Sequence, residues 1–103
     1  GARALRWRPG FAAIRAAVEA VRGGRWDAFV NRRGDWGRDM ALYLGRIEGG
    51  LRLRELGEAA GGIDYGAVSM AIRRFEGRLA SDRVLRRACA AVRRRLTLAR
   101  ETE

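Results

Sequence analysis

The chain has 103 residues and a formal net charge of +10, because 22 arginines and no lysine face 12 acidic residues. A chain of this length forms one domain, buries roughly 60–65% of its unfolded surface, and needs no metal or disulfide to hold a modest core. The absence of histidine excludes zinc fingers and triads with a histidine base, and the single cysteine, Cys89, excludes an internal disulfide.

The first half of the chain predicts three helices separated by glycine. We expect residues 1–8 to be a basic leader or linker and residues 9–100 to form the helical domain. Pro9 suits the first turn of a helix that ends at Gly23-Gly24. The inward face of this helix carries Phe11, Ile14, Val18 and Val21. A short second helix covers residues 26–30. Asp35 is the expected N-cap of a third helix that ends at Gly49-Gly50. Its apolar positions are Met40, Leu44 and Ile47.

The second half predicts three more helices and no strand. A short helix over residues 53–60 buries Leu53 and Leu56. A turn and a helix cap are predicted at Gly61-Gly62-Ile63-Asp64. A fifth helix is predicted over residues 65–79. Its inward stripe consists of Val68, Ile72, Phe75 and Leu79. Ser81 is the expected cap of the last helix. That helix buries Leu85, Ala88, Val92 and Leu96. The predicted fold is an all-α, compact bundle of about six helices.

Arginine is unevenly distributed along the chain. Residues 1–34 hold eight arginines and two acids, for +6, whereas residues 35–64 hold four and six, for −2. Residues 65–100 hold ten arginines and two acids, for +8. An excess of this size favours a polyanionic partner, with nucleic acid first and an acidic membrane surface second.

Residues 53–79 carry the pattern that points to a function. A short amphipathic helix, a glycine turn and a second amphipathic helix make the helix-turn-helix of DNA-binding proteins. Gly57 lies where the two helices must approach closely, and Gly61 and Gly62 permit the positive φ angles of a sharp turn. The outward face of the second helix carries Gly66, Ser69, Met70 and Arg73. The alternative is an ordinary helical hairpin whose charged side is merely solvated.

The chain contains, in this order, three segments: Arg38-Asp-Met-Ala-Leu-Tyr-Leu44, Leu53-Arg-Glu-Leu-Gly57 and Gly61-Gly62-Ile-Asp64-Tyr65-x-x-Val68. They resemble the C-terminal DNA-binding domain of the DnaA family of bacterial replication initiators. The variant Gly62-Ile-Asp-Tyr-Gly-Ala-Val-Ser69, followed by Ile72-Arg-Arg-Phe75, is more similar to the DnaA-like domain attached to REP-associated tyrosine transposases. The resemblance covers about residues 10–98 and implies a Trp-repressor-like fold. The chain departs from the DnaA pattern at Ile63, Tyr65 and Gly66-Ala67, where sequence is read.

The candidate DNA contacts follow from both arguments. Asp64 and Tyr65 start the helix end that usually enters the major groove, close to Gly66 and Ser69. Arg73 and Arg74 lie further along, where an arginine holds phosphate or reaches an outer base. The resemblance aligns Arg38 with an arginine placed against DNA, in the minor groove. The alternative is a solvated arginine whose charge opposes the dipole of its helix. For Tyr65, the alternative is packing.

We expect the chain itself not to be an enzyme. The transposase relatives carry catalysis in an upstream domain with a histidine metal site, and neither Tyr43 nor Tyr65 has a nearby general base. We expect no cofactor, metal, membrane or small-molecule substrate. The expected protein is a cytoplasmic, nucleoid-associated monomer on double-stranded DNA. The competing functions are RNA binding and docking to an acidic protein.

Four other side chains are expected to pack rather than to act: Trp26, Trp36, Tyr43 and Cys89. Trp7 either docks on the domain or stays loose. Arg93-Arg-Arg95 spreads round three sides of its helix and is therefore expected to be a solvated, phosphate-attracting surface rather than one site.

Overall fold

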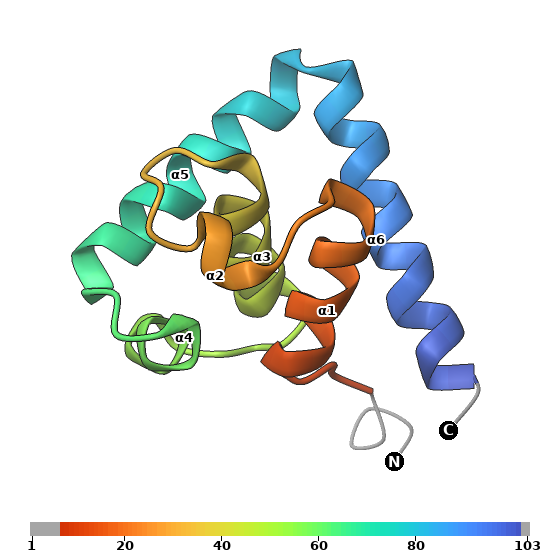
Figure 1. The fold of residues 1–103 in the computed structure, drawn as a ribbon, viewed down its shortest axis with the longest axis horizontal. Coiled ribbons are helices and arrows are strands. Elements are labelled where there is room, and N and C mark those ends of the chain that lie inside the picture. Colours follow the sequence, from red (N-terminus) through yellow and green to blue (C-terminus); the bar gives the residue numbers. More distant parts are fainter. Residues whose placement is uncertain (1–6, 102–103) are drawn as a thin grey trace.

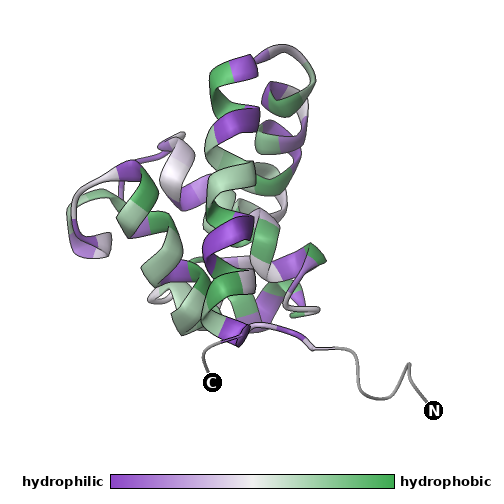
Figure 2. Ribbon diagram, turned by 90° about the vertical axis from the view of Figure 1, so that its right-hand side faces the viewer, coloured by the Kyte–Doolittle hydropathy of each residue, from purple (hydrophilic) through white to green (hydrophobic). Residues whose placement is uncertain are grey.

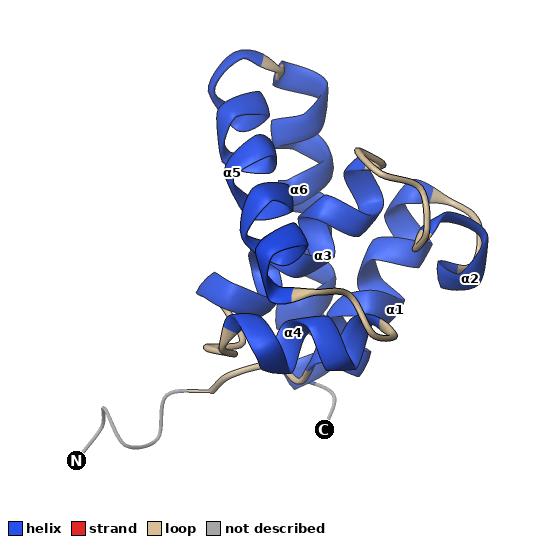
Figure 3. Cartoon of the chain, turned by 90° about the vertical axis from the view of Figure 1, so that its left-hand side faces the viewer, coloured by secondary structure: helices blue, strands red, loops and turns tan. Residues whose placement is uncertain are grey.

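A computed structural model describes residues 7–101 as a bundle of six α-helices (Figure 1). In chain order these are α1 (Phe11–Arg22), α2 (Trp26–Phe29), α3 (Trp36–Ile47), α4 (Leu53–Ala60), α5 (Tyr65–Ser81) and α6 (Arg83–Glu101). Helices and connecting loops account for all of residues 7–101, without a strand (Figure 3). The predicted all-α bundle is therefore confirmed. Residues 1–6 of the expected leader lie outside the described part of the chain.

Helix α3 lies at the centre of the bundle. It contacts α1, α2, α4 and α5, while α6 packs mainly against α1 (Figure 1). Four apolar side chains of α3 are fully buried: Met40, Ala41, Leu42 and Leu44. Fully burying one large apolar side chain contributes about 1.5–3 kcal/mol, so this central helix anchors the others.

Two of the predicted caps are confirmed. The side chain of Asp35 accepts hydrogen bonds from the backbone N–H groups of Gly37 (2.8 Å) and Arg38 (3.4 Å) at the start of α3. Asp64 accepts from the N–H of Gly66 (3.0 Å) at the start of α5. The third is wrong, because Ser81 is the last residue of α5. Asp82 takes the capping place, since its carboxylate accepts from the N–H of Leu85 (2.9 Å).

Several predicted core positions are only half-buried: Val21, Leu53, Leu79 and Ala88. Ile47 is 47% exposed, because it is the last residue of α3 and the chain turns away immediately after it. In α6 the inward position belongs to Cys89 rather than Ala88, so the buried face runs Leu85, Cys89, Val92 and Leu96. The expectation that Cys89 is a buried apolar residue is confirmed. Burial raises the pKa of its thiol, Arg93 opposes this and Glu48 adds to it.

The aromatic residues pack as expected. Trp26 is buried, meets Phe11 and Phe29 edge to face at centroid distances of 5.7 and 5.4 Å, and donates its indole N–H to the carbonyl oxygen of Ala60 (3.3 Å). Tyr43 lies 5.1 Å from the ring of Phe75.

Two further tryptophans lie against the core. Trp36 and Trp7 are both half-buried there. Of the two alternatives for Trp7, the structure therefore supports docking on the domain. The guanidinium of Arg100 stands 5.5 Å from the Trp7 ring, so the last turn of α6 helps to hold this side chain in place. Within residues 7–101, no helix combines the length and the apolar character that crossing a membrane requires.

Candidate functional site

The connection between α4 and α5 is a tight turn in which one carbonyl group accepts two hydrogen bonds, and the N–H of Gly61 also donates to the carbonyl oxygen of Glu58 (3.1 Å). The N–H groups of Gly62 and Ile63 both donate to the carbonyl oxygen of Gly57 (2.9 Å each). Gly61 and Gly62 have φ angles of +117° and +99°, which side chains rarely tolerate. A Cβ atom on Gly57 would overlap the carbonyl oxygen of Ile63. The predicted close approach at Gly57 is therefore present, but it is made to the backbone of the turn.

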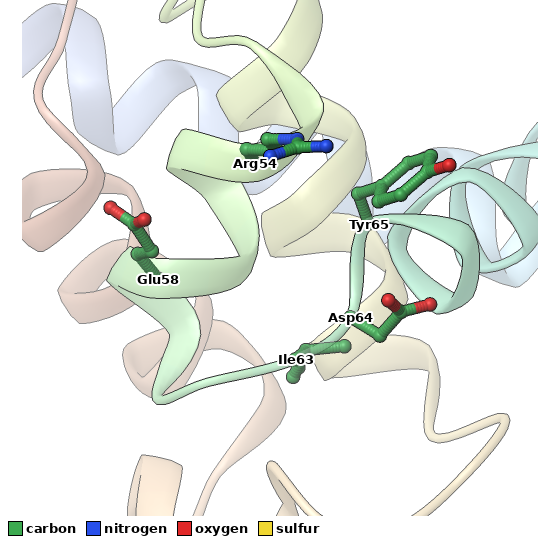
Figure 4. A pocket seen from close by; sticks show the side chains of 5 residues that line it. All are labelled: Arg54, Glu58, Ile63, Asp64 and Tyr65. Carbon is green, nitrogen blue, oxygen red and sulfur yellow. The ribbon is translucent and has the colours of Figure 1, made fainter.

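The first residue of α5 is exposed and faces an arginine. Tyr65 is 52% exposed, and the guanidinium of Arg54 from α4 lies 5.3 Å from the centre of its ring (Figure 4). A cavity of about 340 Å³ opens beside the pair, lined also by Glu58, Ile63 and Asp64. Of the two expectations for Tyr65, a core packing role is thus excluded, and its phenol is accessible to a partner.

The outward face of α5 is close to the predicted one. Ala67, Met70 and Arg73 are exposed, whereas Gly66 and Ser69 are half-buried. The inward face carries Val68, Ala71, Ile72 and Phe75. Because Gly66 and Ala67 have little or no side chain, a partner can approach the backbone of this first turn closely.

Arg74 is tied to the centre of the fold. Its guanidinium donates from Nε to Oδ2 of Asp39 (2.8 Å) and from Nη2 to Oδ1 (3.2 Å), and the Asp39 side chain is fully buried. Hydrogen bonding to Asp39 raises the pKa of Arg74, against the opposing effect of burial. This pair fixes α5 over α3, a structural role that the local pattern around Arg74 did not indicate.

Arg38 is buried without a partner on its Nε atom. Only 8% of the residue is exposed, and no hydrogen-bond acceptor meets Nε. The alternative of a solvated arginine is therefore wrong, and the expected DNA contact of Arg38 stays a prediction. Leaving a buried polar group unsatisfied costs about 1–3 kcal/mol, and proteins leave few of them.

Arg38 lines a cavity of about 330 Å³ that we call the arginine pocket, formed by Arg33, Arg38, Ala67, Met70 and Arg74. The three guanidinium groups come from the loop before α3, from the first turn of α3 and from α5. The carboxylate beside them, that of Asp39, already accepts two hydrogen bonds from Arg74. The pocket is therefore strongly positive.

A second ion pair holds the helix turn on which Arg38 stands. Arg22 donates from Nε to Oδ1 of Asp35 (2.9 Å) and from Nη2 to Oδ2 (2.6 Å). Burial by itself raises the pKa of Asp35, but hydrogen bonds from Arg22, Gly37 and Arg38 outweigh it, so the pKa lies below 3.8. The carboxylate is thus charged near neutral pH and joins α1 to the start of α3.

The structure brings the predicted site residues together on one side. Asp64, Tyr65, Gly66 and Ser69 lie on the turn and first turns of α5, and Arg73 follows on its exposed face. Arg38 and Arg74 line the arginine pocket beside the same helix. Sequence reasoning missed Arg33 and Arg54, for which local charge was the sole signal.

Among residues 7–101, no cluster of three or more histidine, cysteine, aspartate or glutamate side chains is arranged to hold a metal ion. Comparisons of the chain with protein-family models, with curated proteins and with solved structures each found no match.

Proposed function

We propose that this domain binds double-stranded DNA through a helix-turn-helix formed by α4 and α5, and that catalysis, where its parent protein has any, lies outside this chain. The observation that carries the proposal is buried Arg38, whose unmet Nε donor lies in a pocket with Arg33 and Arg74. This pocket contains hydrogen-bond donors and needs acceptors. DNA offers acceptors as phosphate oxygens and as base edges in the minor groove.

The proposed docking places the start of α5 in the major groove. Tyr65 and Ser69 then lie near the base edges, and small Gly66 and Ala67 let the helix sit deep. Arg73 contacts phosphate or an outer base, and Asp64 keeps the helix start capped. The arginine pocket, on the flank of α5, meets the adjacent backbone or minor groove. Arg74 serves this interface while it holds Asp39.

The resemblance to the DnaA C-terminal domain agrees with this docking. Under this proposal the chain is a DnaA-like module of a transposase-like or initiator-like protein, at work in the cytoplasm on the nucleoid as a monomer. The departures at Ile63, Tyr65 and Gly66 then mean that its preferred sequence differs from that of the initiators.

The test begins with selection of a preferred duplex from a random library, followed by fluorescence anisotropy on that duplex and on a scrambled one. We expect log K to fall with log salt with a slope of about −4 to −7. Tyr65→Ala and Ser69→Ala should each reduce the binding free energy that distinguishes the preferred base from the others, by about 1–3 kcal/mol at one position of the site. Arg25→Ala, which removes an exposed charge at the start of α2, is the matched control and should keep the preference.

Two results would overturn the proposal. One is binding that does not change with salt; the other is tighter binding to single-stranded or structured RNA than to duplex DNA. Tight binding to an acidic protein without any duplex binding would favour the protein-docking function instead. Circular dichroism on each variant separates a lost contact from a lost fold.

A further inference from the structure

The last helix carries a charge pattern that the proposed interface does not use. Helix α6 contains seven arginines and no acid before Glu101. Its buried face consists of Leu85, Cys89, Val92 and Leu96. At 100° per residue, three exposed arginines fall directly opposite that face. We call Arg83, Arg87 and Arg94 the α6 stripe.

Three of the other four arginines of α6 have contacts within the fold, while the fourth, Arg95, is exposed and lies about 100° round the helix from Arg94. Arg93 pairs with Glu48 (3.0 Å), Arg86 donates to the carbonyl oxygen of Leu79 (2.8 Å) and Arg100 stands over Trp7. The stripe arginines take part in none of the ion pairs or side-chain hydrogen bonds found within residues 7–101. Their charge is therefore not explained by the fold.

The stripe also works against the helix that carries it. Arg83 is the first residue of α6, where the helix dipole disfavours a cation, and the acid next to it, the capping Asp82, already accepts the N–H of Leu85. Arg83 and Arg87 are like charges four residues apart, a spacing that destabilises a helix by a few tenths of a kcal/mol. Solvated helix faces normally alternate the two signs of charge. A polyanion on this face would relieve both effects.

The stripe lies on a different side of the molecule from the proposed DNA site. In Figure 1, α4 and the start of α5 lie on the left, whereas α6 forms the right-hand edge and rests on α1. Figure 2 looks onto this side and shows hydrophilic turns along the helix that faces the viewer. The molecule measures 39 × 28 × 26 Å, so the core of the bundle separates the two surfaces.

We infer that the α6 stripe is a second surface for double-stranded DNA, which holds the phosphate backbone of another duplex without reading its sequence. This inference rests on the proposed function in taking duplex DNA as the polyanion. Arg83 and Arg94 are 11 residues apart along the helix, a rise of about 16 Å, which matches the axial rise of about five phosphates of one strand. One domain would thereby bridge two duplexes, with α5 on one and α6 on the other.

The test is a bridging assay with the whole chain. A duplex that carries the selected site is fixed to beads, the protein is added, and retention of a labelled duplex of unrelated sequence is measured. Arg87→Gln with Arg94→Gln removes two stripe charges and keeps good helix formers. Arg15→Gln with Arg25→Gln removes two exposed charges from α1 and the start of α2 and is the matched control.

We expect the stripe double variant to retain about tenfold less of the second duplex, as the loss of two phosphate contacts predicts, and to bind the first within about twofold of the parent. Equal retention by both double variants would overturn the inference and leave the proposed function standing. Failure of the parent chain to bind the first duplex would instead contradict the proposed function.

Vesicles containing phosphatidylserine are included as the other polyanion. Stripe-dependent binding to vesicles, together with second-duplex retention that the stripe variant does not change, would overturn the assignment of DNA as the occupant. Circular dichroism at the assay temperature shows that both double variants are folded.

Discussion

The arginine pocket and the α6 stripe use the same residue type in opposite ways. Arg38 and Arg74 are held by the fold: one is buried on the first turn of α3, and the other donates two hydrogen bonds to buried Asp39. Arg87 and Arg94 are exposed on the outside of the bundle. Nearby carboxylates are present in the first region and absent from the outer face of the second.

The difference teaches what each region is suited to recognise. A guanidinium that is fixed in position can demand an acceptor at a defined place, because little side-chain entropy remains to be lost on binding. A solvated guanidinium contributes charge, and its contact weakens with salt whatever the sequence of the DNA. We therefore expect substitutions in the pocket to change folding or to weaken binding to the selected duplex strongly, and substitutions in the stripe to have a small effect on sequence-independent binding alone.

The largest expected effect is on stability and tests whether the ion pair between Arg74 and Asp39 stabilises the fold. Arg74→Ala leaves the carboxylate of Asp39 buried without a cation, so we expect the free energy of unfolding to fall by about 3–5 kcal/mol. Urea denaturation followed by circular dichroism measures this. Its neighbour Arg73→Ala, on the exposed face, is the control and should change stability by less than about 0.5 kcal/mol. Equal stabilities for the two variants would mean that Asp39 does not depend on Arg74.

The next effect concerns the pair that holds the helix turn under Arg38. Asp35→Asn keeps a capping side chain but removes the charge that pairs with Arg22, so we expect a loss of about 1–2 kcal/mol at pH 7. Because the folded pKa of Asp35 is lowered, its contribution is present above pH 3.8 and is lost as the pH falls through the folded value. The stability difference between the parent chain and Asp35→Asn should therefore shrink below about pH 4.

Thermal unfolding of the two proteins between pH 7 and pH 3 measures that difference. The parent and the variant share every other titratable group, so each is the control for the other. A difference that stays constant over this range would show that the ion pair does not stabilise the fold.

Arg38→Ala tests the role of the arginine pocket in DNA binding separately from the stability of the helix bundle. The variant removes a buried donor that has no partner, but it also removes the buried carbon stem of Arg38, so we expect the free energy of unfolding to fall by about 1–2 kcal/mol. Duplex binding should weaken by about 10–100-fold, equivalent to 1–3 kcal/mol. The loss should be equal on all sequences if Arg38 meets phosphate, and dependent on A·T content if it enters the minor groove.

Anisotropy on A·T-rich and G·C-rich duplexes measures both outcomes, and Arg25→Ala again corrects for the loss of one charge. Binding by Arg38→Ala as tight as that of the Arg25→Ala control would remove the pocket from the interface.

Local chemistry made much of the fold predictable. The carboxylates of Asp35 and Asp64 cap helices because each residue directly precedes apolar residues at helical spacing. Gly61 and Gly62 take positive φ angles because the four-residue turn needs them. Tyr65 could be assigned to the start of its helix for the same reason. These features depend on a few adjacent residues, which a sequence displays directly.

The features that sequence reasoning missed depend on distant partners or on small rotations. Arg74 and Asp39 are 35 residues apart, and Arg22 and Asp35 are 13 apart, so neither pair follows from spacing. The buried state of Arg38 likewise depends on how α5 packs over α3. In α6, Ala88 and Cys89 differ by 100° around the helix, and packing against α1 selected Cys89 for the core.

The smallest expected effect belongs to a single residue of the α6 stripe. Arg94 is exposed and solvated, so Arg94→Ala should leave stability unchanged within about 0.5 kcal/mol. On a duplex that carries the selected site, binding should weaken by less than about twofold, because the contacts that α5 makes to this duplex remain. On an unrelated duplex, the slope of log K against log salt should become shallower by about 1, since one phosphate contact is lost. A salt titration of both duplexes measures this, with Arg25→Ala as the control. If Arg94→Ala altered the base preference at the selected site, as we expect of Tyr65→Ala and Ser69→Ala, the division between positioned and solvated arginines would be wrong.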